Sequence, residues 1–288
     1  MDQVETLRQH VAVEEAERPV RVVAITSGKG GVGKTNVTAN LAVALAHLGR
    51  RVMVLDADLG LGNLDVLLGL TPAHSLADVF AGRKKLAEVV VKGPAGIMVL
   101  PAGSGFQDVT ALTDYQFREL ESEMDTWQDK LDVLLIDTGA GIGRNVTFFA
   151  MMAQEIIVVA TPEPTSVTDA YALMKVLSTR YQERRFRLLV SQARSVPEGR
   201  EVYRTLSLVT DRFLNVSLDF LGSVPFDSRL RDAVRRQRAL VELFPQSPAG
   251  QAFVKLAQDI VDMPPPGGLK GGLQFFWRSL LRKETPCP

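Results

Sequence analysis

Two residue types that often build functional sites are scarce in this sequence. The 288 residues include one cysteine, Cys287, and three histidines, His10, His47 and His74. A single cysteine cannot form a disulfide within the chain or a cluster of thiolate ligands, and the histidines lack the spacing of zinc ligands. The sequence therefore argues against a disulfide-stapled domain and against a structural metal site.

The sequence also lacks an excess of charge and a long apolar run. Lysine plus arginine equal aspartate plus glutamate, 33 of each, so we expect no direct binding to nucleic acid. No apolar run approaches the ~20 residues that span a bilayer. The polar first residues lack the apolar core of a signal peptide, and we therefore expect a cytoplasmic protein.

Four parts are expected along the chain. Residues 1–19 form a polar tail, and residues 20–262 alternate short apolar runs with helical patterns. Residues 263–272 have the proline and glycine content of a linker, and residues 273–288 contain a separate amphipathic helix. The alternation of strand and helix predicts an α/β fold, a doubly wound, mostly parallel sheet with helices on both faces.

The apolar runs within residues 20–262 predict strands at 20–26, 51–56, 97–101, 132–137, 155–160, 186–191 and 218–224. Helical patterns lie at 34–48, 113–128, 144–153, 165–181, 198–213 and 249–262. Ligands of such sheets bind at the carboxyl ends of the strands. The motifs that carry chemistry all follow strands, as this rule requires.

The most specific motif is GKGGVGKT, residues 28–35, directly after the first predicted strand. It fits the phosphate-loop pattern G-x-x-x-x-G-K-[ST], in which backbone N–H groups surround a phosphate. Lys34 is expected to bind the β- and γ-phosphates, and the Thr35 hydroxyl to bind Mg²⁺. The following helix points its positive end at the same anion. The predicted phosphate-binding residues are Gly28, Gly30, Gly31, Val32, Gly33, Lys34, Thr35 and Asn36.

A second lysine, Lys29, follows the first glycine of this loop. KGGVGKT resembles the deviant Walker A loop of the MinD/ParA family of dimerising ATPases, in which the extra lysine reaches the partner subunit's nucleotide. A cation supplied in trans would stabilise the charge that develops on the phosphate oxygens. The resemblance implies that Lys29 is catalytic in a homodimer formed with ATP. Some relatives hold iron–sulfur clusters or arsenite through cysteines, which this chain lacks.

Acidic and glycine-rich segments after two other strands resemble further parts of that family's site. DADLGLGN, residues 56–63, resembles switch I, which implies that Asp58 positions water and joins the metal shell, while Asp56 supports the loop. DVLLID ends in Asp137, a Walker B arrangement that would hold Mg²⁺. The following TGAG resembles switch II, and Gly141 is assigned as the sensor of the γ-phosphate.

The base pocket departs from the family pattern. Many relatives place an asparagine after the sixth strand to read adenine, whereas this chain has Ser191 and Gln192, either of which can hydrogen-bond a base edge. LGSVPFD resembles the loop on the other side of the base, with Pro225 as its candidate contact. The Asn-Lys-x-Asp guanine motif is absent, and we predict ATP as the nucleotide.

The segment LQFFWRSLLRK has the pattern of an amphipathic helix of its own. Basic residues lie opposite an apolar stripe, as in helices that bind an anionic membrane surface. Docking of this helix on the protein's own core is the alternative. The stripe consists of Leu273, Phe276, Trp277, Leu280 and Leu281.

The amino-terminal tail contains DQVETLR, which resembles the D-Q-A-x-x-L-R motif of FlhG/FleN proteins, a subgroup of the MinD/ParA family. Asp2, Gln3, Leu7 and Arg8 match it. The motif implies activation of an FlhF-type GTPase. EPTSVTDAYALMK, RLRDAVRRQRALVELFP and LQFF also resemble this subgroup, so the resemblance covers nearly the whole chain.

These resemblances together predict an ATPase that dimerises with ATP, binds the inner face of the cell membrane and regulates flagellar number and placement. Its expected partners are an FlhF-type GTPase and a flagellar transcription regulator of the FleQ type. Three alternatives stay open from the sequence. They are a MinD-type ATPase of the cell-division site, a ParA-like DNA-partition ATPase, and a regulatory binding module whose slow ATPase is a timer.

Overall fold

A computed structural model of the chain describes residues 20–58, 62–101, 103, 127 and 130–264. The expected polar tail 1–19, the predicted carboxyl-terminal helix 273–288 and most of the predicted helix 113–128 lie outside these residues. Among the described residues, no helix combines the length and the apolar character needed to cross a membrane.

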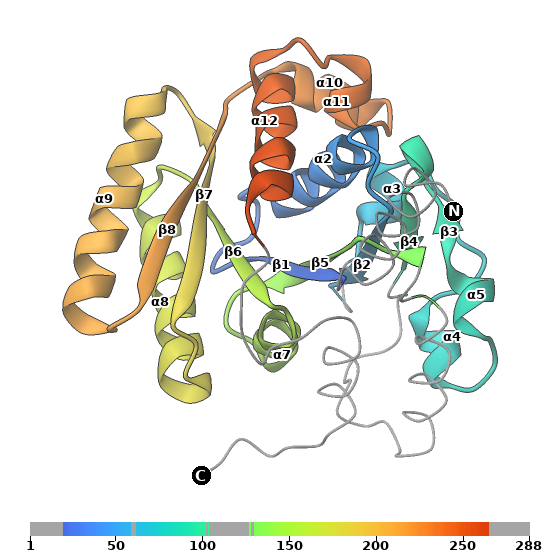
Figure 1. Cartoon of the computed structure of the whole chain (residues 1–288), viewed down its shortest axis with the longest axis horizontal. Helices are drawn as coiled ribbons and strands as arrows, with labels where there is room; N and C mark the ends of the chain where they lie inside the picture. The colour runs from blue at the N-terminus through green and yellow to red at the C-terminus, as the bar shows by residue number, and fades with distance from the viewer. Residues whose placement is uncertain (1–19, 59–61, 102, 104–126, 128–129, 265–288) are drawn as a thin grey trace, which may run out of the picture.

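The described residues form an eight-stranded sheet with the order β3-β4-β2-β5-β1-β6-β7-β8 (Figure 1). Neighbouring strands are parallel except β3 and β4, which are antiparallel. The chain order reverses at β1, which pairs with β5 on one side and β6 on the other, and ligands of doubly wound sheets bind at such a point. The strands are β1 (Arg21–Ser27), β2 (Val52–Ala57), β3 (Val91–Lys92), β4 (Met98–Leu100), β5 (Val133–Ala140), β6 (Glu155–Ala160), β7 (Arg185–Ala193) and β8 (Ser217–Pro225).

Helices cover both faces of the sheet (Figure 1). One face carries α2 (Lys34–His47) and α12 (Pro248–Asp262), with the short helices α10 (Arg229–Arg235) and α11 (Leu240–Leu243) beside them. The other face carries α7 (Arg144–Met152), α8 (Pro164–Tyr181) and α9 (Val196–Phe213). The predicted doubly wound fold is confirmed.

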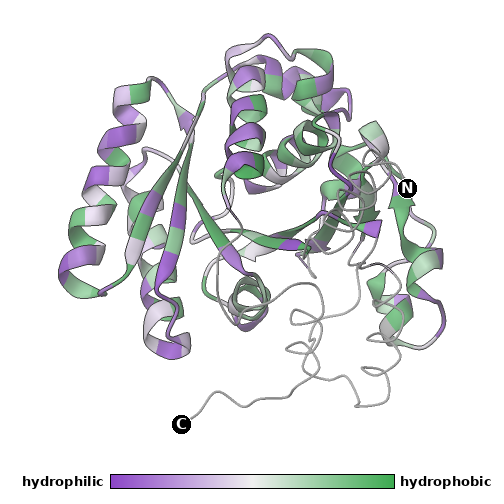
Figure 2. Cartoon of the chain, viewed as in Figure 1, coloured by the Kyte–Doolittle hydropathy of each residue, from purple (hydrophilic) through white to green (hydrophobic). Residues whose placement is uncertain are grey.

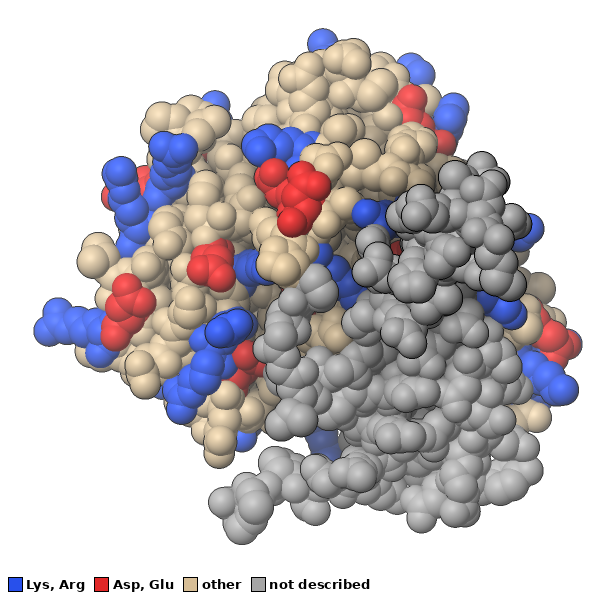
Figure 3. Space-filling model, viewed as in Figure 1, with Lys and Arg blue, Asp and Glu red and all other residues tan. Residues whose placement is uncertain are grey.

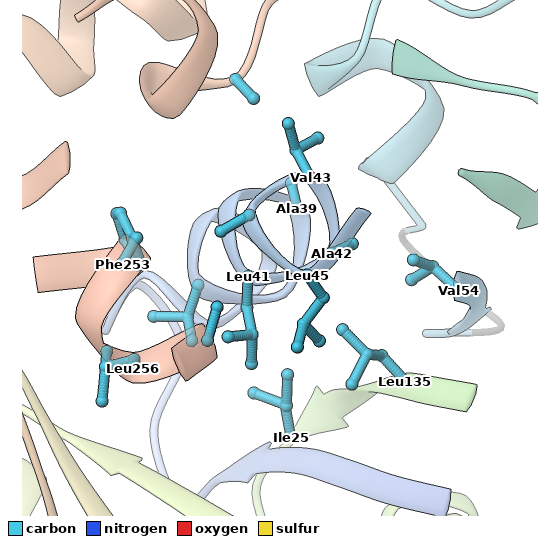
Figure 4. Packing of buried hydrophobic residues seen from close by; sticks show 14 of the residues in the cluster. Ile25, Ala39, Leu41, Ala42, Val43, Leu45, Val54, Leu135, Phe253 and Leu256 are labelled. Atoms are coloured by element: carbon cyan, nitrogen blue, oxygen red, sulfur yellow. The ribbon is translucent and has the colours of Figure 1, made fainter. Parts of the chain in front are cut away.

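Buried apolar side chains on both faces explain the continuous apolar runs of the strands. Figure 2 colours each residue of these strands by its hydropathy. In β1, Ile25 packs toward α2 while its neighbour Ala24 belongs to the cluster on the opposite face. Figure 4 shows Leu41 and Leu45 of α2 directed at Ile25, and Phe253 of α12 belongs to the same cluster. The phosphate loop therefore stands between two elements of the core, the central strand β1 and the buried helix α2.

Short elements were not predicted. They are α3 (Leu64–Leu67), α4 (Leu76–Phe80), α5 (Leu86–Val89), a 3₁₀ turn (Pro94–Gly96), α10, α11 and the two-residue strand β3. Segments this short do not complete a helical or strand period, so hydrophobic periodicity cannot detect them. Helices α8, α9 and α12 also begin one or two residues before their predicted starts, because each holds a proline in its first turn, where the missing N–H is tolerated.

A buried arginine joins the two ends of the described domain. Arg21, at the start of β1, donates to the carbonyls of Ile260 and Met263 at the end of α12, and to the carboxylate of Glu155. Arg187 also pairs with Glu155. The attachment points of the amino-terminal tail and of the carboxyl-terminal segment are therefore neighbours.

Candidate functional site

The phosphate loop turns between β1 and α2 and packs against α8. Gly33 caps α2 with φ of 90°, and Gly31 has φ of 79°, a left-handed conformation that favours glycine. A Cβ on Gly28 would lie 2.0 Å from the carbonyl oxygen of Asp169 in α8. Gly30, in contrast, faces open space, and Val32 is buried. Only glycine fits at position 28.

Lys34 and Asp137 meet in the buried part of the site. The ammonium of Lys34, which is 8% exposed, lies 3.8 Å from Oδ1 of Asp137. Thr38 donates to the same oxygen at 3.1 Å, and the Thr35 side chain also hydrogen-bonds Asp137. Burial raises the pKa of Asp137, and Lys34 with the two hydroxyls opposes this rise. The sequence missed Thr38, although it lies one helical turn after Lys34.

Two more carboxylates lie at the carboxyl end of β2, Asp56 within the strand and Asp58 directly after it. Asp56 accepts the N–H groups of Asp58 at 3.2 Å and Leu64 at 3.3 Å, which fits its predicted role in supporting the loop. Burial and the nearby Asp137 raise the pKa of Asp56 to about 7. The Asp58 carboxylate is close to Gly139, since a Cβ on that glycine would lie 3.4 Å from Oδ1. Asp56, Asp58 and Asp137 thus form a cluster of carboxyl groups, and Asp137 is the member that contacts Lys34.

This donor set fits Mg²⁺. The metal prefers hard oxygen ligands and is usually held by one or two carboxylates together with substrate phosphates. Thr35, Asp137 and Asp58 supply a hydroxyl and two carboxylates next to the phosphate loop. The mutual repulsion of the carboxylates would be relieved by a cation.

Lys29 is held on the other side of the loop. Its ammonium donates to Oε2 of Glu163 and to Oγ1 of Thr165, each at 2.8 Å, at the start of α8. The Lys29 side chain is 36% exposed, so it lies at the surface, apart from the buried Lys34. The sequence missed Glu163 and Thr165 as its partners, because they are more than 130 residues away in the chain.

Three of the predicted nucleotide contacts, Gly141, Gln192 and Ser191, lie close to the phosphate loop or to the strand before it. The Gly141 N–H donates to the Ser27 carbonyl at 2.8 Å, and the Gln192 amide donates to the Gly31 carbonyl at 3.4 Å. Ser191 is buried, and its Oγ would lie 3.3 Å from a Cβ on Gly33. The Asn36 Oδ1 is buried without a hydrogen-bond partner in the described residues.

The structure brings together most of the predicted site. Pro225 ends β8 and is paired in register with Ala193 of β7, next to Gln192. The predicted tail residues Asp2, Gln3, Leu7 and Arg8, and the five residues of the apolar stripe from Leu273 to Leu281, lie outside the described residues.

Comparison with known proteins places the chain in a family. Residues 19–261 match the ParA family, described as NUBPL iron-transfer P-loop NTPase. The chain is 51% identical over 264 residues to the antiactivator FleN of Pseudomonas aeruginosa, covering 92% of this chain and 94% of that protein. It is 32% identical to the flagellum site-determining protein YlxH of Helicobacter pylori, covering 91% and 90%. Its single cysteine gives no support to the iron-transfer part of the family description.

Solved structures of cell-division proteins share the fold. The MinC:MinD complex of Aquifex aeolicus is 30% identical with a TM-score of 0.68, covering 86% of this chain and 99% of the other. MinD of Pyrococcus horikoshii complexed with Mg-ADP is 29% identical with a TM-score of 0.67, covering 84% and 96%. With its phosphate loop, its buried Lys34–Asp137 pair and its extra lysine, the chain belongs to the ParA/MinD family of P-loop ATPases, in the FlhG/FleN subgroup.

Proposed function

We propose that this protein is a nucleotide-switched ATPase that dimerises with ATP, associates with the membrane and regulates flagellar number and placement. The observation that carries the proposal is the combination of a buried Lys34–Asp137 pair with a surface lysine, Lys29, in the same phosphate-loop motif. The 51% identity to an antiactivator named FleN, and the similarity to a flagellum site-determining protein, support the flagellar role.

Hydrolysis would use residues from both sides of the loop. Lys34 and the loop N–H groups bind the phosphates, and Thr35 and Asp137, with Asp58 beside them, would hold Mg²⁺. The metal, when bound, neutralises charge on the phosphate oxygens. Asp58 orients the attacking water, and the Gly141 N–H is released from Ser27 to contact the γ-phosphate.

Lys29 would act on the partner's nucleotide. In the single chain its ammonium is occupied by Glu163 and Thr165 at the surface. A second copy facing this surface would offer phosphate oxygens in their place, and the lysine would then stabilise the charge that develops on the partner's phosphate oxygens during hydrolysis. Hydrolysis therefore requires the homodimer.

The two tails would supply the partners. Residues 273–288 bind an anionic membrane surface when the dimer presents two copies, which gains avidity, and the protein is then peripheral on the inner face of the cell membrane. Residues 1–19 activate an FlhF-type GTPase through Asp2, Gln3, Leu7 and Arg8. Arg21 joins the points at which the two tails leave the described domain. This supports the proposal that both tails act on the same side of the molecule.

A flagellar transcription regulator of the FleQ type is the further proposed partner, in keeping with the name antiactivator. Nucleic acid is not proposed as a direct partner. Positive and negative side chains are interspersed over the described part of the face in Figure 3, with no single-sign field across it.

Co-sedimentation with anionic lipid vesicles tests the proposal. The full chain should pellet with ATP and much less with ADP, and a chain ending at residue 268 should stay in solution with either nucleotide. Equal behaviour of the two chains would refute the membrane role of the terminal helix.

Deletion of residues 2–11 separates the flagellar role from that of a division-site ATPase. The deletion should abolish stimulation of an FlhF-type GTPase while leaving ATP-dependent pelleting intact. Unchanged stimulation would favour the MinD-type alternative, although similarity to MinD of Synechocystis, 34%, is lower than to FleN.

A further inference from the structure

Arginine is concentrated in α10 and the turn after it, residues 229–238, which we call the arginine segment. It contains five arginines and no lysine, against one carboxylate, Asp232. The whole chain has no net charge, so the segment is a local excess of positive charge. All five arginines are exposed, and they are Arg229, Arg231, Arg235, Arg236 and Arg238.

The guanidinium groups of the arginine segment have unused donors. Within the described residues they donate no side-chain hydrogen bond, and their two ion pairs are long, 3.9 Å from Arg235 to Asp232 and 3.6 Å from Arg238 to Glu242. Each guanidinium has five N–H donors in a fork that matches a carboxylate. The segment can therefore bind carboxylates from outside the chain.

Exposed apolar side chains lie beside these arginines. Val234 in α10 is 38% exposed and Val66 in α3 is 55% exposed. Gln237 joins them, because its N–H donates to the Val234 carbonyl at 2.9 Å and its amide to the Val66 carbonyl at 3.0 Å. Arginine and apolar side chains without lysine are typical of protein interfaces. Nucleic acid requires a continuous positive surface, which Asp232 and Glu242 interrupt.

The surroundings of the arginine segment connect it to two elements of the nucleotide site. Helix α3, which the segment contacts, begins at Leu64, whose N–H donates to Asp56 at 3.3 Å. In α11, directly after the segment, the N–H of Val241 donates to the buried Asn40 of α2 at 3.1 Å. Asn40 in turn donates to the Asn36 carbonyl at 2.8 Å, in the first turn of the phosphate-loop helix. A partner on the segment would therefore act on both elements.

We infer that the arginine segment and Val66 form a docking surface for an acidic, amphipathic segment of a partner protein, and that its occupation changes the affinity for nucleotide. Carboxylates of the partner pair with the guanidinium groups, and its apolar side chains cover the two valines. The linkage is reciprocal, so nucleotide changes the affinity for the partner by the same factor. The linkage rests on the proposed nucleotide site, whereas the docking surface does not.

Titration with a fluorescein-labelled peptide, with glutamate on one face of a helix and leucine on the other, tests the docking surface. The full-length chain without nucleotide should bind it. Arg235→Glu combined with Arg236→Glu should weaken binding by about tenfold or more, because like charges then face each other. Val66→Thr, which keeps the shape and replaces a methyl group by a hydroxyl, should weaken binding by about threefold.

Arg204→Glu is the matched control. Arg204 on α9 is also exposed and also pairs with a carboxylate three residues earlier, Glu201, at 3.5 Å. This variant should bind the peptide as the wild type does. Equal weakening by Arg204→Glu and by the double variant would overturn the docking surface, because the attraction would then be an unspecific effect of charge.

Two further titrations decide between occupants. A single-stranded oligonucleotide that binds more tightly than the peptide, with an affinity that Val66→Thr leaves unchanged, would overturn a protein partner in favour of nucleic acid. Residues 1–19 contain five carboxylate side chains. Tighter peptide binding by a chain that lacks them would assign the surface to the protein's own tail.

The linkage is tested by repeating the peptide titration with ADP. ADP should change the dissociation constant of the peptide by about fivefold or more in the wild type. Gln237→Gly should abolish this change, since glycine keeps the left-handed backbone, φ of 53°, and removes the amide that contacts α3. An unchanged constant in a wild type that binds ADP would overturn the linkage. Failure to bind ADP would refute the proposed nucleotide site and the linkage with it, while the titration without nucleotide still decides the docking surface.

Discussion

Lys29 and Lys34 belong to one loop motif but lie in different environments. Lys34 is buried against Asp137, whereas Lys29 is at the surface against Glu163 and Thr165. The sequence predicts different roles for the two lysines, because the phosphate-loop pattern requires a lysine at position 34 and allows any residue at position 29. It could not indicate what holds Lys29, because those partners come from the far half of the chain.

Replacing Glu163 by glutamine should ease the release of Lys29. Exposed ion pairs contribute up to ~1 kcal/mol each, and the dimer releases two of them, so the ATP-dependent dimer should tighten by up to about thirtyfold. Sedimentation velocity with ATP, in an Asp58→Ala background that slows hydrolysis, measures the change. Asp259→Asn, which removes the exposed pair with Lys255 on α12, is the control and should have no effect. A weaker dimer would show instead that Glu163 orients Lys29 for the partner.

Asp56 should make the nucleotide-free chain less stable as pH rises. Its folded pKa of about 7 exceeds the ordinary 3.8, so between these values the folded chain holds a proton that the unfolded chain has released. Stability therefore falls from about pH 4 to about pH 7. Relative to the wild type, Asp56→Asn should gain roughly 2–3 kcal/mol between pH 5 and pH 8. Urea unfolding with a chelator present measures this, and parallel pH curves for the two proteins would contradict it.

The contact between the phosphate loop and α8 is the decisive feature at the scale of elements. Gly28 has no room for a side chain beside Asp169, so strand, loop and helix are locked together where Glu163 and Thr165 also hold Lys29. The motif predicted glycine at this position for its own turn. The close contact of Gly28 with α8 is tertiary, so a local sequence pattern could not predict it.

Gly28→Ala should separate the loop from α8. Overpacking of this kind costs about 1–3 kcal/mol, and thermal unfolding should show a clearly lowered midpoint in the absence of nucleotide. Gly30→Ala is the matched control in the same loop, because a Cβ there meets nothing within 4 Å. Equal midpoints for the two variants would mean that α8 moves away without cost.

Long elements were predictable and short ones were not. The strands of the central sheet are apolar runs buried on both faces, and their predicted limits agree with the structure to within three residues. Helices α10 and α11 complete no clear period, and their positions depend on tertiary contacts such as the N–H of Val241 with Asn40 and the Gln237 amide with Val66. Those contacts tie the segment after β8 to α2 and α3.

The whole molecule is proposed to work as a pair. One chain provides the buried phosphate site, Asp58 and Asp137, but its Lys29 lies at the surface and is engaged with its own α8. In the proposed dimer each site is completed by the other subunit. This division of the site predicts that two different inactive variants can restore activity to one another.

Mixing Lys29→Ala with Asp58→Ala is the most direct test of this claim. Each variant alone should hydrolyse ATP at a small fraction of the wild-type rate, as expected on removing a cation that acts in trans, typically by 10³-fold or more. In a mixed dimer, the subunit that keeps Asp58 receives Lys29 from its partner. An equimolar mixture should therefore recover about a quarter of the wild-type rate, since random pairing makes half of the dimers mixed and each has one complete site. A mixture no more active than its components would show that Lys29 acts within its own chain.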